Sequence, residues 1–277
     1  MGVRIWALGI AATGLAVLAI QVTRRHRNAF PDPVMLSLMA KMQAAVYQNP
    51  ALAYPVPYRL FTPNATEAGV RYPLVVYLHG AGGRGNDNQK QLGLDVERIL
   101  APEARALGPF FLVAPQCPDG DEWINRHASP PFRTYDQSKF PESDASKATL
   151  AIVQELLARL PIDPDRVFLT GVSMGGSGTW DLITRHPGVF AAAIPVTGVG
   201  DPSRASVIAK LPIWAFHGTR DNISPIENFR AMRRALQDLG SGARFSELEG
   251  VGHDSWNQAY TQLETFRWLL QQRRSAE

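Results

Sequence analysis

The chain has 277 residues, 45% of them hydrophobic, so it is long enough to bury one large core. Its formal net charge is +3, but residues 1–30 contain four arginines and no acidic residue, which leaves the remainder close to neutral. We therefore expect no nucleic-acid partner, because that function needs a clustered basic face on the folded domain. Cys117 is the single cysteine and excludes an intramolecular disulfide. We expect no metal site and no cofactor.

The first 30 residues have the pattern of a membrane-targeting segment. Residues 5–22 are apolar apart from Thr13 and Gln21, with Arg4 before them and a basic cluster at 24–27. This length suits either a short spanning helix or a long signal peptide. We expect residues 1–30 to be an uncleaved membrane anchor or, alternatively, a signal segment. The protein is then exported or attached to a membrane.

Residues 31–54 are expected to connect this segment to a catalytic domain at 55–277. Hydrophobic residues recur at helical spacing between Val34 and Val46, which predicts an amphipathic helix over 31–48. Further along the chain, strands are expected near residues 58–61, 73–78, 110–115, 167–172, 191–196, 213–216 and 243–248. Helices are expected near residues 95–107, 144–160, 174–185 and 258–272. This alternation predicts an α/β fold with a mostly parallel sheet and helices on both faces.

Residues 166–176 predict a strand that runs through a tight turn into a helix. The turn reads Gly-Val-Ser-Met-Gly and places Ser173 between Gly171 and Gly175. This Gly-x-Ser-x-Gly pattern is typical of a nucleophile elbow, in which the serine is exposed on a strained bend. The five-residue pattern alone also occurs by chance, so its interpretation depends on finding partners for Ser173.

A serine hydroxyl becomes a good nucleophile when a base takes its proton and an acid orients that base. If the catalytic residues follow the chain order serine, acid, histidine, the candidate base is His253. It lies in a loop after the last predicted strand. Asp221 follows the predicted strand at 213–216, where side chains collect at the carboxyl edge of a parallel sheet. Asp201, which follows the preceding strand, is the reserve candidate for the acid.

A glycine-rich loop follows the predicted strand at 73–78. Gly80, Gly82 and Gly85 match the dinucleotide-binding pattern Gly-x-Gly-x-x-Gly, so that function has to be considered. The pattern also requires an acidic residue at the end of a second strand about twenty positions on, and none is predicted there. Alternatively, the loop donates a backbone N–H to an oxyanion. We expect the donors to be Ala81 and Met174.

Two further segments bear on the substrate. Residues 116–142 form a long stretch without periodicity, which we expect to lie as a wall over the active site. Trp123 in this stretch, Gly82 and Trp256 are the expected substrate-binding residues. The gap at 197–212 is too short for a large lid domain, which favours an open cleft.

Three motifs together carry a resemblance to a known superfamily. They are Leu-His-Gly-Ala-Gly-Gly-Arg-Gly-Asn-Asp-Asn at 78–88, Gly-Val-Ser-Met-Gly-Gly-Ser-Gly-Thr-Trp at 171–180 and Gly-His-Asp-Ser-Trp at 252–256. The chain resembles the α/β-hydrolases, and more closely the esterases and peptidases related to polyhydroxybutyrate depolymerases, feruloyl esterases and the catalytic domain of prolyl oligopeptidases. The resemblance covers about residues 55–273.

The resemblance implies an α/β-hydrolase fold, a Ser173–Asp221–His253 triad and cofactor-free hydrolysis of a small or polymeric carboxylic ester. A serine peptidase of the prolyl-oligopeptidase kind is the first alternative. A non-catalytic or dinucleotide-binding protein is the second, and it leaves the three triad candidates without a role.

Overall fold

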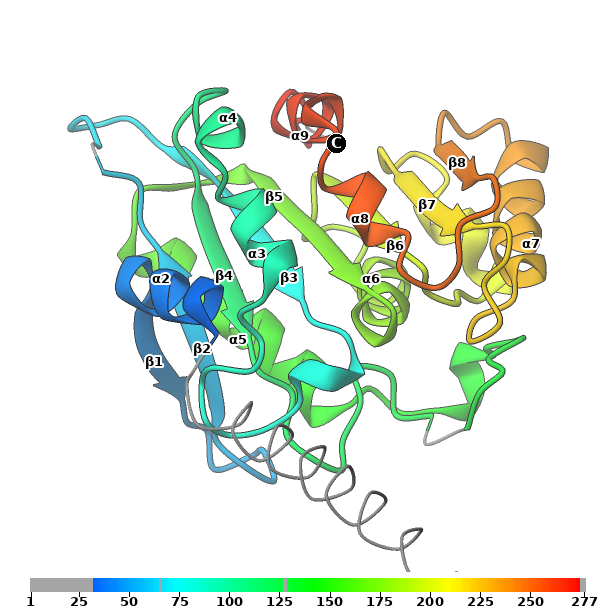
Figure 1. The fold of residues 1–277 in the computed structure, drawn as a ribbon, viewed down its shortest axis with the longest axis horizontal. Coiled ribbons are helices and arrows are strands. Elements are labelled where there is room, and N and C mark those ends of the chain that lie inside the picture. Colours follow the sequence, from blue (N-terminus) through cyan, green and yellow to red (C-terminus); the bar gives the residue numbers. More distant parts are fainter. Residues whose placement is uncertain (1–31, 65, 127–128, 275–277) are drawn as a thin grey trace, which may run out of the picture.

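An eight-stranded sheet organises the computed structural model, which describes residues 32–64, 66–126 and 129–274. The strands lie in the order β1-β2-β4-β3-β5-β6-β7-β8. β2 is antiparallel to both of its neighbours, and β4, β3 and β5 to β8 form a parallel set (Figure 1). Their bounds are β1 Gln43–Tyr47, β2 Val56–Phe61, β3 Tyr72–Leu78, β4 Phe111–Pro115, β5 Ile162–Val172, β6 Ala192–Val196, β7 Trp214–Gly218 and β8 Arg244–Leu248.

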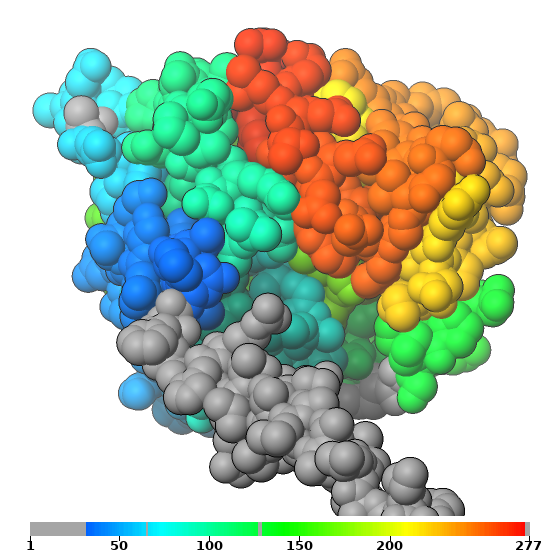
Figure 2. Space-filling view, viewed as in Figure 1, coloured from blue at the N-terminus to red at the C-terminus, as the bar shows by residue number. Residues whose placement is uncertain are grey.

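Helices cover both faces of this sheet, as the sequence predicts. One face packs on α2 (Pro33–Lys41), α3 (Leu94–Ile99), α4 (Pro102–Arg105), α8 (Trp256–Ala259) and α9 (Leu263–Leu270). The other packs on α5 (Asp144–Arg159), α6 (Met174–Arg185) and α7 (Ile226–Asp238). Three short 3-10 helices complete the described part: η1 (Ala81–Gly83), η2 (Gln137–Lys139) and η3 (Pro202–Ile208). Figure 2 shows the C-terminal helices, in orange and red, packed beside the green segment that holds α3 and α4.

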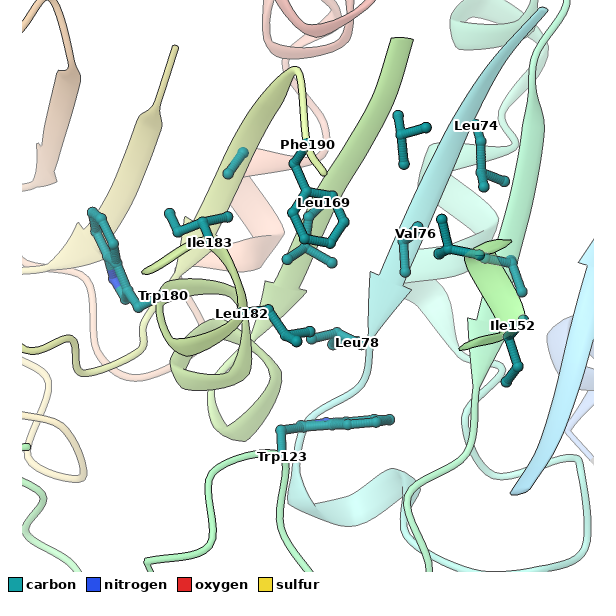
Figure 3. Close-up of a cluster of buried hydrophobic side chains, with 14 of the residues drawn as sticks. Leu74, Val76, Leu78, Trp123, Ile152, Leu169, Trp180, Leu182, Ile183 and Phe190 are labelled. Atoms are coloured by element: carbon teal, nitrogen blue, oxygen red, sulfur yellow. The ribbon is translucent and has the colours of Figure 1, made fainter. Parts of the chain in front are cut away.

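The core has two layers because successive side chains of a strand point to opposite faces. In β3, Leu74, Val76 and Leu78 pack on the side of α5 and α6, whereas Val75 and Tyr77 pack on the side of α3 and α9. Figure 3 shows the first of these layers. Full burial of each such aliphatic side chain contributes about 1.5–3 kcal/mol. A continuous apolar run is therefore what a strand covered on both faces requires.

The region between 31 and 48 differs from the prediction. The helix ends at Lys41, the backbone of Met42 is extended, and Gln43–Tyr47 is the edge strand β1 paired with β2. Backbone pairing with β2 outweighs the helical spacing of a few apolar residues, so the single helix over 31–48 is wrong. The sheet consequently begins before residue 55, the predicted start of the catalytic domain.

Two other predicted helices are divided. The one near 95–107 is interrupted before Pro102, which begins α4, and the C-terminal one consists of α8 and α9. The gap at 197–212 holds only η3, so no large lid domain is inserted there. The expected signal or anchor at 1–30 lies outside the described residues. Within the described ranges, no helix is long and apolar enough to span a bilayer.

Candidate active site

Ser173 occupies the turn between β5 and α6. Its φ is 54° and its ψ is −114°, a backbone conformation that costs a non-glycine residue about 1–3 kcal/mol. The glycines on either side permit this turn. A Cβ on Gly175 would overlap the carbonyl of Leu78, and a Cβ on Gly171 would overlap the carbonyl of Gly175. The packing of β3, β5 and α6 thus holds Ser173 in the strained conformation.

Ser173, His253 and Asp221 lie together in one chain of hydrogen bonds. Oγ of Ser173 lies 2.7 Å from Nε2 of His253, and Nδ1 of His253 lies 2.8 Å from Oδ2 of Asp221. The other carboxylate oxygen, Oδ1, accepts the backbone N–H of Ile223 at 2.8 Å and of Ser224 at 2.9 Å. A chain of this kind can pass the serine proton to the histidine while the carboxylate holds the imidazole in place.

The electrostatics of this chain favour an ionised acid. Asp221 is buried, which raises its pKa, but hydrogen bonds from His217, His253 and the Ser224 N–H outweigh the burial and hold the pKa well below its usual value. Asp221 is therefore a carboxylate at neutral pH, and Nδ1 of His253 must carry the proton that it shares with that carboxylate. Nε2 of His253 is then free to accept the proton of Ser173.

Asp201, the reserve acid, has a different place. Its Oδ1 accepts the N–H of Ser203 at 2.9 Å and caps η3, and its Oδ2 accepts the N–H of Gln137 at 2.8 Å. Both oxygens of Asp201 stabilise loops, so the structure selects Asp221 as the partner of the histidine.

The two expected oxyanion donors each begin a helical turn at the cleft. Ala81 is the first residue of η1 and Met174 the first residue of α6, and both line the same cavity as Ser173. The N–H groups of the first residues of a helix have no acceptor within that helix. They are thus suited to bind a developing negative charge.

The glycine-rich loop after β3 leads into the three-residue η1 and not into a helix that could hold a pyrophosphate. This removes the structural basis for dinucleotide binding.

His79 fixes the loop that carries Ala81. Its Nδ1 lies 2.7 Å from the carbonyl of Gly80, and its Nε2 lies 2.9 Å from the N–H of Cys117, which it accepts. Burial lowers the pKa of His79 to about 4, so the ring is neutral at physiological pH. A Cβ on Gly83 would overlap this ring. Gly83 is therefore required by the packing of the loop.

A cleft of about 700 Å³ surrounds Ser173 and His253. Gly82 and Trp256, two of the three expected substrate-binding residues, line it. The ring of Trp256 meets the ring of His253 edge-on, with the centroids 5.5 Å apart. The long loop also contributes to the wall, as expected, through residues within 122–132.

The expected substrate contact of Trp123 is wrong. The side chain is completely buried, does not line the cleft, and donates its Nε1 hydrogen to the carbonyl of His79 at 2.9 Å. Figure 3 shows it in the core beside Leu78. Trp123 thus packs under the loop that holds Ala81, whereas the loop residues that follow it reach the cleft.

Sequence reasoning also missed several charged and polar groups near the cleft. Arg84 pairs with Glu122 at 3.5 Å, and the guanidinium of Arg126 lies 4.0 Å from the centroid of the Phe132 ring. Gln116 donates to the carbonyl of Gly83 at 3.2 Å and so supports the glycine-rich loop. These residues lie in segments without periodicity, which gave no signal of their location. Within the described part of the chain, no group of three or more potential ligands could hold a metal ion.

The sheet order, the elbow and the geometry around Ser173 define an α/β-hydrolase fold. Residues 60–262 match the model of the Dienelactone hydrolase family. The chain therefore belongs to this family.

Solved structures and curated proteins that are similar to this chain include several named esterases. The fold matches the crystal structure of a thermostable esterase with a TM-score of 0.79 and 36% identity, covering 86% of this chain and 64% of that one. Carboxylesterase SOBER1 of Arabidopsis thaliana is 26% identical over 211 residues, which are 69% of this chain and 88% of SOBER1. NocK of Nocardia uniformis subsp. tsuyamanensis, which is named as an esterase, is 28% identical over 173 residues, 61% of this chain and 46% of NocK.

The chain therefore spans about half of NocK and a little less than two thirds of the thermostable esterase. Peptidases share the fold as well, among them an acylaminoacyl peptidase of Pyrococcus horikoshii at 15% identity and a TM-score of 0.60. The predicted resemblance to esterases and peptidases of the α/β-hydrolase superfamily is confirmed.

Proposed function

We propose that the protein hydrolyses carboxylic esters through an acyl-enzyme formed on Ser173. His253 acts as general base and then as general acid, and Asp221 orients it. The observation that supports this most is the chain of hydrogen bonds from Ser173 Oγ through His253 to Asp221. Its three members come from distant parts of the sequence, and the nucleophile is held in a strained backbone conformation.

Acylation begins when Ser173 Oγ attacks the ester carbonyl carbon. The hydroxyl proton passes to Nε2 of His253, the C=O double bond opens, and its electron pair becomes the oxyanion. The backbone N–H groups of Ala81 and Met174 bind this oxyanion. When the tetrahedral intermediate collapses, the bond to the alcohol oxygen breaks, and the proton on Nε2 of His253 goes to that oxygen.

Deacylation repeats these steps with water as the nucleophile. His253 takes a proton from water, the hydroxide attacks the acyl carbon, and the proton returns to Ser173 Oγ as it leaves. The imidazolium that forms in each step faces the ionised carboxylate of Asp221, which stabilises it. The products are the free acid and the alcohol, and the enzyme regains its starting state.

The lining of the cleft bears on where the substrate lies. Trp256 packs against His253, the group that protonates the leaving oxygen, so the substrate atoms near that oxygen contact the indole ring. Gly82 leaves the entrance beside the oxyanion donors free of a side chain. The 116–142 loop shapes the substrate site through the residues that it contributes to the cleft wall, which include Glu122, Arg126 and Phe132.

A fluorophosphonate probe tests the proposal, because it reacts with an activated serine in the same geometry as an ester. The folded protein should be labelled on Ser173, and Ser173→Ala should not be labelled. The absence of label on folded protein, or label that persists in Ser173→Ala, would reject the proposed nucleophile.

Peptide hydrolysis is the alternative that the shared fold of peptidases raises. The same groups can act on an amide, but an amine is a poorer leaving group than an alcohol. Matched substrates with one acyl group and either an ester or an anilide leaving group separate the two functions. We expect kcat/KM to be higher for the ester, and a preference for the anilide would favour the peptidase.

The location in the cell is a separate proposal. We infer from the apolar run at residues 5–22 and its basic flanks that the protein is exported or membrane-attached. Fractionation of cells that express the full chain, together with the mass of its N-terminal peptide, distinguishes a retained anchor from a cleaved signal. Full-length protein confined to the cytosolic fraction would contradict both.

A further inference from the structure

A second histidine lies behind Asp221, on the side away from the cleft. His217 is the fourth residue of β7, and its side chain is 1% exposed. Its Nε2 lies 2.6 Å from the backbone carbonyl of Ser224 and 3.4 Å from Oδ2 of Asp221. Oδ2 is the same oxygen that contacts His253. Asp221 is thus flanked by two imidazoles, and only His253 lines the cleft.

The contacts of His217 define its protonation. A carbonyl oxygen can only accept a hydrogen bond, so Nε2 of His217 must carry a hydrogen. Nδ1 is buried and has no hydrogen-bond partner. A hydrogen on Nδ1 would be a buried donor without an acceptor, which is unfavourable. The contacts therefore favour the Nε2–H tautomer of His217, with this N–H directed at Ser224 and Asp221.

This histidine is a poor choice if the site needs only a filled volume. Its ring packs against Phe229, with the centroids 5.2 Å apart, and its Nδ1 loses its hydrogen bond to water without replacement. An apolar side chain of similar size would avoid that loss. The N–H on Nε2 is the property that such a side chain lacks.

Ser224 links the two sides of the turn. Its N–H donates to Oδ1 of Asp221, and its carbonyl accepts from His217. The turn at Ser224 is thereby hydrogen-bonded both to His217 of β7 and to the carboxylate of Asp221. This arrangement fixes the carboxylate with Oδ2 directed at His253.

We propose that His217 is a positioning residue for the acid: its Nε2–H holds the Asp221 carboxylate and the turn at Ser224 in the orientation that His253 requires. The proposal rests on the function proposed for Asp221. His217 does not touch substrate and transfers no proton. Its contribution is to the geometry and charge of the carboxylate.

The matched variants are His217→Gln and His217→Met. Their side chains have the same length, but only glutamine can donate a hydrogen bond from the position of Nε2. We expect Met to lower kcat for an ester about 10- to 100-fold with KM within about twofold, because a misplaced catalytic group lowers the rate strongly. Gln should recover most of the loss.

The pH profile of kcat/KM gives a readout that a structural role would not move. In His217→Met the carboxylate of Asp221 loses a hydrogen-bond donor, so the acidic limb of the pH profile should move to higher pH. In His217→Gln the acidic limb should remain near that of the wild type. The other charged group beside His217 is Glu247 of β8, which Arg230 and Arg233 hold and which neither variant alters. Equal profiles and equal kcat for the two variants would overturn the proposal.

Nitrogen-15 NMR of the histidine rings supplies a test that does not depend on the activity of any variant. The ring signal that is absent from His217→Gln but present in His79→Gln should show its hydrogen on Nε2. A ring with its hydrogen on Nδ1 alone would contradict the proposal. Loss of fluorophosphonate labelling in the wild type would instead count against the catalytic role of Ser173, so the two failures are distinguishable.

Discussion

Ser173 Oγ lies 2.7 Å from His253 Nε2, although 80 residues separate the two along the chain. Ser173 directly follows β5, and His253 lies in the loop after β8. Both loops leave the carboxyl ends of parallel strands, which meet at one edge of the sheet. The neighbouring glycines hold Ser173 in place, and the hydrogen bond to Asp221 holds His253 in place. We therefore expect a substitution at either residue to affect activity without displacing the other residue.

The strained backbone of Ser173 predicts an unusual order of stabilities. At φ 54° and ψ −114°, glycine is accommodated more easily than alanine. We expect Ser173→Gly to be about 1 kcal/mol more stable than Ser173→Ala. Both variants should be inactive. Urea unfolding measures the difference, and an alanine variant of equal or greater stability would show that the serine is not strained.

Asp221 and Asp201 form a matched pair for assigning the acid. An amide at 221 would present an N–H to His253 and favour the wrong tautomer, so Asp221→Asn should lower kcat about 10³- to 10⁴-fold. Asp201→Asn should keep activity within about threefold, and it should lose about 1 kcal/mol of stability with its hydrogen bonds. Steady-state kinetics on one ester compares them. The reverse order of effects would assign the acid to Asp201.

The two tryptophans should separate stability from substrate binding. Trp123→Phe removes the hydrogen bond to the His79 carbonyl and should cost about 1–3 kcal/mol of unfolding free energy. Trp256→Ala should lower kcat/KM at least about fivefold by removing the wall beside His253, with a smaller effect on stability. Denaturation and kinetics are measured on both. A changed KM in Trp123→Phe alone would restore its predicted substrate role.

His79 predicts a loss of stability in acid. Burial lowers its pKa to about 4 in the folded protein, against about 6.5 in the unfolded chain. Between these values only the unfolded chain binds the proton, so the free energy of unfolding falls as the pH falls from 6.5 to 4. Because each pKa unit corresponds to about 1.4 kcal/mol, the loss approaches 3 kcal/mol.

The control for this pH effect is His79→Gln, which does not titrate in that range. Urea unfolding at pH 7 and pH 4.5 should show a smaller fall for the variant than for the wild type. All other ionisable groups are common to both proteins and cancel in the comparison. An equal fall in both would show that His79 does not bind its proton differently on folding.

The elbow was predictable because its signals are local. A strand, two glycines around Ser173 and a helix follow each other within a few residues, and chain order then indicated His253. Strand β1 was not predictable in this way. Residues 43–47 have apolar groups at a spacing that also suits a helix, and only their pairing with β2 decides the outcome.

The surroundings of the site were harder to predict, since burial is a property of the folded chain. Trp123 and Arg126 lie three residues apart in one irregular loop, yet the first is in the core and the second lines the cleft. The His-Gly pair at His217 gave no sign that its ring would lie against Asp221. Contacts of this kind depend on where β7 ends relative to the turn that follows it.

The proposed mechanism requires that an acyl group is transferred to Ser173 during turnover. Rapid acid quenching of the enzyme with a p-nitrophenyl ester, followed by mass spectrometry of the peptides, detects this transfer. We expect an adduct of the acyl mass on the peptide that contains Ser173, and no adduct in Ser173→Ala. An enzyme that releases nitrophenol with no acyl group on that peptide, or with the group on another residue, would contradict the mechanism.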